Sequence, residues 1–355
     1  MLTIASRPGH PAPVHPTATP PAPPRASGAR QAVGVAAAAV SGGAIAVQSR
    51  INGELGARLH DGIAAATISF LTGMALLLIL VPATASGRAG LAAIRVALRR
   101  RQLRPWQCLG GVCGAFLVLT QGVTVAALGV AVFTVAMVAG QSASGLLVDR
   151  AGVGPTGKHP VTVPRLIGAG LAVVSVGISV ADRLTSPRMI VLAALPAVAG
   201  LGVAWQQAVN GRVRQAAGSA LPAAFVNFVA GTTTLIVVFA GNVAVRGLPS
   251  GALPTQWWLY TGGAMGVALI AIAATVVRLT GVLLMGLAMI AGQLLCALIV
   301  EVVAPGDGTG PGGHTLLGVA LTLVAVGITA LPPRWPGQLP TAPRPGATPR
   351  PGRWA

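Results

Sequence analysis

The stretch Gln48-Ser49-Arg50-Ile51-Asn52-Gly53 is a polar patch that closes a long apolar run. A second patch, Gln206-Gln207-Ala208-Val209-Asn210-Gly211, also closes an apolar run and repeats Gln, Asn and Gly at the same internal spacing. The two patches lie 158 residues apart (206 − 48). This recurrence indicates an internal duplication, and the expected fold follows from it.

Further blocks match in the same order along both halves of the chain. Phe70-x-x-Gly73 returns as Phe228-x-x-Gly231, Trp106-x3-Gly110-Gly111-x2-Gly114 as Trp258-x3-Gly262-Gly263-x2-Gly266, and Ala139-Gly140-Gln141 as Ala291-Gly292-Gln293. The first block keeps the shift of 158, whereas the later blocks have a shift of 152 (258 − 106). The six-residue difference falls in a basic loop, where length changes are tolerated.

The composition excludes a soluble protein of this length. Hydrophobic residues make up 54% of the chain, charged residues only 8%, and the mean hydropathy is +0.77. A soluble domain usually carries about a quarter charged residues, so this chain could not cover its own surface in water. We expect an all-α polytopic membrane protein in contact with the lipid bilayer.

Ten apolar runs approach the ~20 residues that a membrane-spanning helix needs. The expected spans are 32–51, 63–82, 106–125, 129–148, 164–181, 189–209, 221–241, 257–277, 281–301 and 315–332. They divide into two five-helix repeats at 32–182 and 189–332. Pro-rich tails at 1–31 and 333–355 are expected to be disordered, and the first lacks the apolar core of a secretory signal.

Basic residues indicate the orientation in the membrane. With the N-terminus inside, nineteen of the 24 Lys and Arg fall on the cytoplasmic side, as the positive-inside rule requires. The net charge of +18 is therefore mainly an orientation signal and not a sign of nucleic-acid binding. We expect a multi-pass protein of a bacterial cytoplasmic (inner) membrane with both termini cytoplasmic.

An odd number of spans in each repeat inverts the second copy relative to the first. Inverted repeats related by a two-fold axis in the membrane plane are typical of secondary transporters, whose substrate sites lie between the halves. The sequence thus predicts a transporter that works by alternating access.

The repeated amides are candidates for the substrate path. Gln48 and Asn52, like Gln206 and Asn210, are four residues apart and share one helical face. An unpaired amide in hydrocarbon costs several kcal/mol, so that face should meet protein or water. The amides either line a path or gate, or form structural helix–helix bonds, while the glycine that follows each pair is expected to end its helix.

A second amide pair lies deeper, because Gln141 and Gln293 sit about two-thirds along their spans. They are further substrate-contact candidates, and the alternative is a helix–helix hydrogen bond. Asp149 and Glu301 close the same two spans and are candidates for proton coupling. The alternative for the carboxylates is an ordinary solvated helix end, with Asp149 paired to Arg150.

Two pairs of glycines have the spacing that lets helices approach closely: Gly110 with Gly114, and Gly262 with Gly266. We expect them to pack inside the protein, and the alternative is a homodimer seam. The three cysteines lie in apolar runs, and we expect no disulfide. No catalytic, metal or cofactor constellation is evident, so we predict no cofactor, no metal and no enzyme activity.

The repeated blocks resemble the YdcZ-like branch of the drug/metabolite transporter (DMT) superfamily over about residues 32–332. Members of that branch are often single five-span units, and this chain looks like two such units fused. The resemblance implies a ten-span inverted-repeat fold, a central cavity and transport of small polar metabolites or drugs. We therefore expect a secondary transporter of a small organic solute that works by alternating access, with proton coupling as one option. The alternative is a non-transporting accessory or sensor subunit.

Overall fold

The computed structural model describes residues 28–155, 157–158, 160–181, 187–269, 272, 282–304, 310–329 and 331. Within these ranges the regular structure is helical and contains no strand. The elements are α1 (Gly28–Leu59), α2 (Gly62–Ala83), α3 (Ala85–Arg99), η1 (Pro105–Leu109), α4 (Gly110–Leu128), α5 (Val130–Ala151), α6 (Val163–Val180), α7 (Pro187–Ala217), α8 (Ala220–Arg246), η3 (Trp257–Tyr260), α10 (Val282–Val303) and α11 (Gly313–Thr329). The tails 1–27 and 332–355 lie outside the described residues.

The helices agree with most of the expected spans. Seven helices are long and apolar enough to cross a membrane, and α6 and α11 are shorter apolar helices at two further expected positions. The eighth expected span is described as helical at 262–269. The prediction of an all-helical membrane protein built from two repeats is confirmed, while the count of ten spans stays a prediction.

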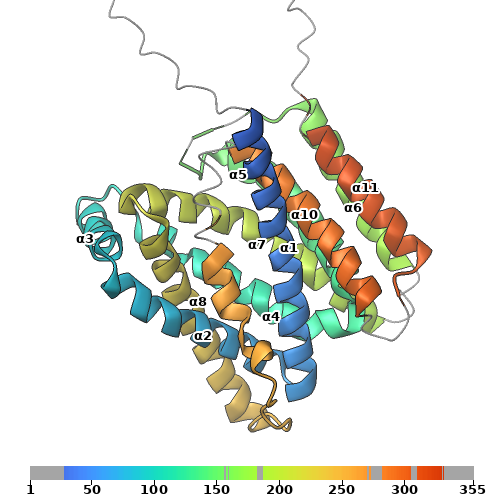
Figure 1. The fold of residues 1–355 in the computed structure, drawn as a ribbon, viewed down its shortest axis with the longest axis horizontal. Coiled ribbons are helices and arrows are strands. Elements are labelled where there is room, and N and C mark those ends of the chain that lie inside the picture. The colour runs from blue at the N-terminus through green and yellow to red at the C-terminus, as the bar shows by residue number, and fades with distance from the viewer. Residues whose placement is uncertain are drawn as a thin grey trace, which may run out of the picture.

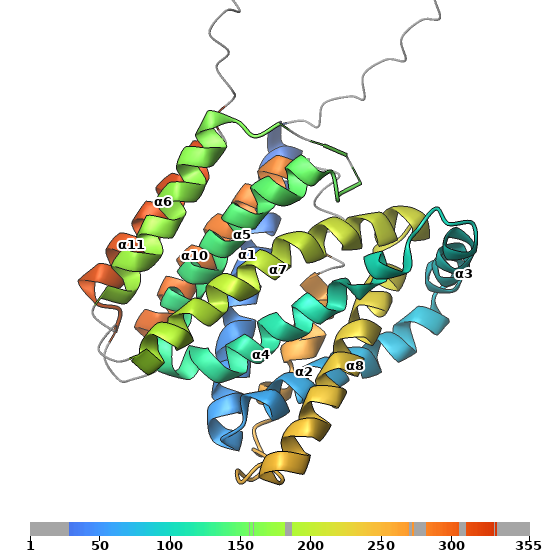
Figure 2. The same ribbon diagram turned by 180° about the vertical axis from the view of Figure 1, so that it is seen from behind.

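The two repeats pack against each other in a reciprocal pattern. α1 packs on α10, and its counterpart α7 packs on α5, the counterpart of α10. The remaining pairs, α2 with α8 and α6 with α11, join counterparts directly. Both pairs lie side by side from opposite views of the molecule (Figures 1 and 2). Such self-matching contacts are those expected of two copies related by a two-fold axis.

Phe70 on α2 and Phe228 on α8 mark the place where the two copies meet. They occupy equivalent repeat positions, and their ring centroids lie 5.0 Å apart. Each ring lies against the other repeat's glycine. A methyl group added to Gly73 would come within 2.3 Å of the Phe228 ring, and one added to Gly231 within 2.2 Å of the Phe70 ring. The Phe-x-x-Gly motif of each repeat therefore provides the contacts at which the two repeats meet.

Two expectations about local structure were wrong. α1 continues through Gly53 to Leu59, and α7 continues through Gly211 to Ala217, so neither glycine ends its helix. At Gly53 the reason is packing, because an added methyl group would lie 2.6 Å from Cβ of Val125 on α4. Gly53 lets two helices approach closely instead of stopping one of them.

The basic segment expected as a loop at 83–105 instead contains the helix α3. Thr84 accepts a hydrogen bond from the Gly87 backbone N–H at 3.2 Å and caps the helix start. One face of α3 is buried and the rest exposed, so hydrophobic periodicity stabilises a helix that lies at the end of the transmembrane bundle. A segment rich in arginine is typical of a loop between membrane spans, but the spacing of its apolar residues is that of a helix.

Candidate functional site

The α1 amide cluster consists of Ser49, Asn52 and Gln121. Asn52 Nδ2 donates to Gln121 Oε1 at 2.7 Å, and Gln121 Nε2 donates to Ser49 Oγ at 2.9 Å. All three side chains are buried. Asn52 Oδ1 has no hydrogen-bond partner within the described part of the chain, although it is buried. The cluster joins α1 to α4 inside the first repeat.

Gln48 extends this polar face toward the second repeat. Its Nε2 donates to the carbonyl oxygen of Gly262 at 2.7 Å. A methyl group added to Gly262 would lie 2.4 Å from Asn52 Oδ1 and 2.8 Å from Ser69 Oγ. The absence of a side chain at Gly262 thus lets the polar face of α1 reach the backbone of the other repeat.

The α7 amide cluster consists of Gln206, Asn210 and Asn227. Gln206 Nε2 and Asn210 Nδ2 both donate to Asn227 Oδ1, at 3.1 and 2.9 Å. On the other side, methyl groups added to Gly110 and Gly114 would meet Asn210 Oδ1 at 2.5 Å and Gln206 Nε2 at 2.6 Å. The glycine pair of the first repeat therefore packs on the amides of the second, as Gly262 and Gly266 pack on Asn52 and Gln48.

Asn52 and Asn210 differ in exposure although their repeat positions are equivalent. Asn52 is 0% exposed, whereas its counterpart Asn210 is only partly buried. Ser49 is also 0% exposed, whereas its counterpart Gln207 is exposed. Asn52 is thus more deeply buried than Asn210, although Asn227 of the α7 amide cluster is buried as well.

Glu301 holds the junction between α4 and α5. The junction is a single residue, Gly129, whose φ of +81° is in the region that favours glycine. Glu301 Oε2, from the end of α10, accepts the first N–H of α5, that of Val130, at 2.7 Å. The carboxylate is only 4% exposed, so the solvated helix end weighed in the sequence analysis is wrong for Glu301.

The other end of α5 is also held by a charged side chain from the second repeat. Arg212 on α7 donates to the carbonyl oxygens of Val153 at 2.7 Å and Gly152 at 3.0 Å, directly after the last turn of α5. An anion at the N-terminus and a cation at the C-terminus both match the helix dipole. The second repeat therefore clamps α5 at both ends.

Asp149 has a different partner from the one expected. Its carboxylate pairs with Arg165 at the start of α6 instead of Arg150, and both side chains are one-third exposed. Asp149 and Glu301 occupy equivalent repeat positions, but only Glu301 is buried. The burial leaves Glu301 as the stronger candidate for coupling.

Gln141 and Gln293 have few polar contacts. Gln141 Nε2 donates to Gln207 Oε1 at 3.2 Å near the surface, which links α5 to α7. Gln293 is 4% exposed, and within the described part of the chain its amide approaches only Met137 Sδ, at 4.0 Å. This buried amide therefore has only a weak hydrogen-bond partner.

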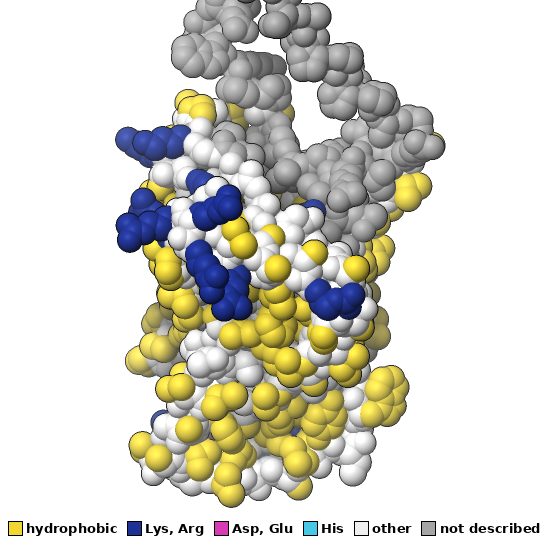
Figure 3. Space-filling view, turned by 90° about the vertical axis from the view of Figure 1, so that its left-hand side faces the viewer, with side chains coloured by type: hydrophobic (Ala, Val, Ile, Leu, Met, Phe, Trp, Pro, Cys, Tyr) yellow, Lys and Arg dark blue, Asp and Glu magenta, His cyan; other side chains and the backbone are white. Residues whose placement is uncertain are grey.

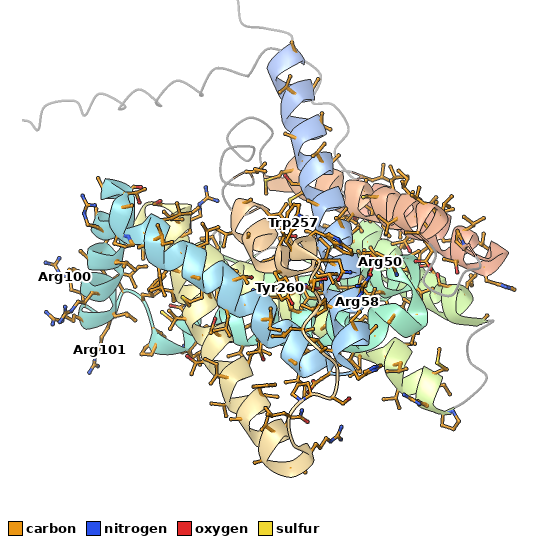
Figure 4. All side chains as sticks on the ribbon, turned by 60° about the horizontal axis from the view of Figure 1, so that its bottom comes forward. Arg50, Arg58, Arg100, Arg101, Trp257 and Tyr260 are labelled. Atoms are coloured by element: carbon orange, nitrogen blue, oxygen red, sulfur yellow. The ribbon has the colours of Figure 1, made fainter. Side chains whose placement is uncertain are left out.

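Arg50 carries a charge inside α1 without an ion partner in the described ranges. The neighbouring carboxylate of Glu54 is taken by Arg58, whose Nη2 lies 2.6 Å from Glu54 Oε1. Figure 4 shows Arg50 and Arg58 on α1 near Trp257 and Tyr260, whereas Arg100 and Arg101 project from the far end of α3. Ala208 stands at the equivalent place in the second repeat, so this charge is unique to the first.

Sequence analysis missed Gln121 and Asn227, which complete the two clusters. Each is an isolated amide within a long apolar run, and that rarity was a usable signal. Neither amide is repeated in the other half of the chain, because Gln121 aligns with Ala273 and Asn227 with Ser69. In the part of the chain that the structure describes, no three His, Cys, Asp or Glu side chains gather as metal ligands would.

A family model with the description "Putative inner membrane exporter, YdcZ" matches residues 33–179 and again 191–328. The chain belongs to the DMT_YdcZ family. The double match identifies the chain as two fused units of this family, which is part of the DMT superfamily. The family is one of membrane proteins of the inner-membrane exporter type.

Structural comparison is consistent with the same fold. A solved structure titled only "Crystal structure of protein" is 16% identical and has a TM-score of 0.50, covering 85% of this chain and 96% of that one. No curated protein matches the chain. These relatives indicate the architecture and name no cargo.

Proposed function

We propose that this YdcZ-family protein is a secondary transporter that moves a small organic solute across the membrane by alternating access. The observation that supports it most is the unequal burial of the two amide clusters. Asn52 and Asn210 occupy equivalent positions in the two repeats, yet Asn52 is fully buried and Asn210 only partly. Exchange of these two environments is the motion that alternating access requires.

In this proposal the α1 amide cluster is the closed gate and the α7 amide cluster the open one. With the N-terminus inside, as the distribution of basic residues predicts, the α7 amide cluster lies on the cytoplasmic side, and in this proposal the conformation is inward-facing. Gln141 on α5 and Gln293 on its counterpart α10 contact the solute. The seam at Phe70 and Phe228 is where the two halves move against each other, since each ring packs on the other repeat.

Glu301 is the proposed proton-coupling group. Its carboxylate binds an N–H at the start of α5, and α5 carries Gln141 on its later turns. A protonated carboxyl accepts a hydrogen bond more weakly than a carboxylate does. Protonation would therefore loosen the α4–α5 junction and release α5, which links proton binding to movement of the solute path.

The experiment uses the equivalent positions Ser49 and Gln207. Cysteine is placed at one or the other in a chain whose Cys108, Cys113 and Cys296 are replaced by alanine. Labelling by a membrane-impermeant maleimide is then measured in inside-out and right-side-out vesicles. We expect ready labelling at 207 from the cytoplasmic side and slow labelling at 49, with the ratio reversing under an imposed pH gradient.

Transport itself is tested as solute flux into proteoliposomes, over a panel of amino acids, sugars, polyamines and cationic drugs, with and without a pH gradient. Absence of flux for the whole panel, together with unchanged cysteine labelling, would contradict transport. That outcome would favour the non-transporting subunit instead.

A further inference from the structure

The helix α3 presents three distinct stripes along its length. One stripe is buried and consists of Gly87, Gly90, Ile94 and Ala97. With 3.6 residues per turn, the opposite side carries Ala85, Ala89, Ala92 and Val96, and all four are exposed. Between these two stripes runs a basic stripe of Arg88, Arg95 and Arg99. An exposed apolar stripe bordered by arginine is typical of a helix that lies in a membrane interface.

The buried stripe of α3 packs against other helices of the protein. Ile94 and Ala97 belong to an apolar cluster with Val213 and Ala217 of α7 and Ala223 of α8. This packing anchors α3 against the bundle and fixes which side faces outward. The exposed stripe is therefore held in place and is not a consequence of a loosely attached helix.

Most guanidinium groups around this stripe have no protein partner in the described ranges. Arg88 donates to the carbonyl oxygen of Pro82 at 2.5 Å, whereas the side chains of Arg95, Arg99, Arg100 and Arg101 form no ion pair or hydrogen bond there. The sequence has no acidic residue between Asp61 and Asp149. Figure 3 shows basic side chains gathered in one half of this face and hydrophobic side chains filling the other. The positive charge is thus left for an external anion.

A hollow of about 510 Å³ opens between α3 with its following turn and the end of α7. Val96 and Gln102 line it from α3 and the following turn, and Arg212 and Gln215 line it from the end of α7. The lining combines apolar, amide and cationic groups. Such a lining suits the glycerol and upper acyl chain of a lipid, while the phosphate binds the arginines at the end of α3.

We propose that α3, the turn at 100–104 and this hollow form a binding surface for anionic phospholipid headgroups of the cytoplasmic leaflet. The phosphate is held by Arg99 and Arg100, and the exposed Ala85–Val96 stripe enters the interface. Guanidinium groups suit this role because they bind phosphate oxygens in pairs. The bound lipid holds α3 against the ends of α7 and α8, next to the α7 amide cluster.

The test is lipid binding to the full-length protein in a neutral detergent. The apparent Kd for phosphatidylglycerol and for phosphatidylcholine is measured by native mass spectrometry. We expect the wild type to prefer phosphatidylglycerol, and Arg99→Gln/Arg100→Gln to weaken its binding at least fivefold, since each basic residue at an anionic surface contributes about fivefold. The matched control is Arg188→Gln/Arg246→Gln, two exposed arginines at the opposite end, with an unchanged Kd expected.

Three outcomes would overturn the proposal. They are equal affinity of the wild type for both lipids, an unchanged Kd in Arg99→Gln/Arg100→Gln, and displacement of the lipid by equimolar glycerol phosphate, which would indicate a soluble-anion site. If the double variant fails to fold, Arg99→Lys/Arg100→Lys replaces it. That variant keeps the charge, and its Kd should rise less than fivefold while still weakening with added salt.

Discussion

Glu301 Oε2 lies 2.7 Å from the backbone nitrogen of Val130 and joins the end of α10 to the start of α5. The two residues are 171 positions apart in the chain. The bond crosses from one repeat to the other at the single-residue break between α4 and α5. A buried carboxylate of the second repeat therefore caps the helix that follows this break.

Replacing Glu301 by glutamine tests its role in coupling. Glu301→Gln keeps the shape and one acceptor oxygen but cannot lose a proton, so we expect the response of flux to a pH gradient to fall at least tenfold. The measurement is solute uptake into proteoliposomes at fixed internal pH and varied external pH. Glu54→Gln is the matched control, because Glu54 pairs with Arg58 near the surface and should leave the response unchanged. A full gradient response in Glu301→Gln would remove this residue from coupling.

Replacing Gly129 by alanine tests the junction itself. Its φ of +81° and ψ of 161° form a conformation that glycine adopts far more readily than other residues, and an added methyl group would lie 2.2 Å from Glu301 Oε1. We expect Gly129→Ala to destabilise the protein by about 1–3 kcal/mol, measured as a lower unfolding temperature in detergent. Gly145→Ala on α5 is the control, because open space surrounds that position. Equal unfolding temperatures for the two variants would contradict the strain argument.

Replacing Gln121 by leucine tests the α1 amide cluster. The change leaves Asn52 Nδ2 and Ser49 Oγ without their partner in a buried site, at a cost of about 1–3 kcal/mol. In the proposed transporter it also weakens the closed gate, so labelling of a cysteine at position 49 should become faster. Thr120→Val, on the same helix, is the control, since the Thr120 hydroxyl only donates to the Phe116 carbonyl within its own helix. Unchanged labelling would mean that the cluster is structural and not a gate.

Replacing Gln141 or Gln293 by alanine tests solute contact. We expect either change to abolish flux while expression and unfolding temperature stay near wild type, because Gln293 has only the weak Met137 contact to lose. Gln141 also bonds Gln207, so Gln207→Ala separates the loss of this bond from the loss of a solute contact. Flux at the wild-type rate in both alanine variants would remove the two residues from the solute path.

Sequence reasoning succeeded where the signal is local or repeated. The apolar runs, the polar patch at Gln48–Gly53 and the Phe-x-x-Gly motif are all patterns within about one helix length, and they predicted the helices, the duplication and the family. The role of Gly53 was misjudged because a glycine after a polar pair resembles a helix stop. Only the approach of Val125 from another helix shows its purpose.

The sequence by itself determined that this chain is a helical membrane protein built from two repeats, because hydrophobicity and its periodicity are carried by neighbouring residues. The tertiary structure alone decided that Asn52 bonds Gln121, that Glu301 caps α5, and that Asn52 is fully buried while its counterpart Asn210 is partly exposed. These are pairings of single polar groups far apart in sequence. They arise because each amide or carboxylate removed from water must find a partner wherever helix packing brings one.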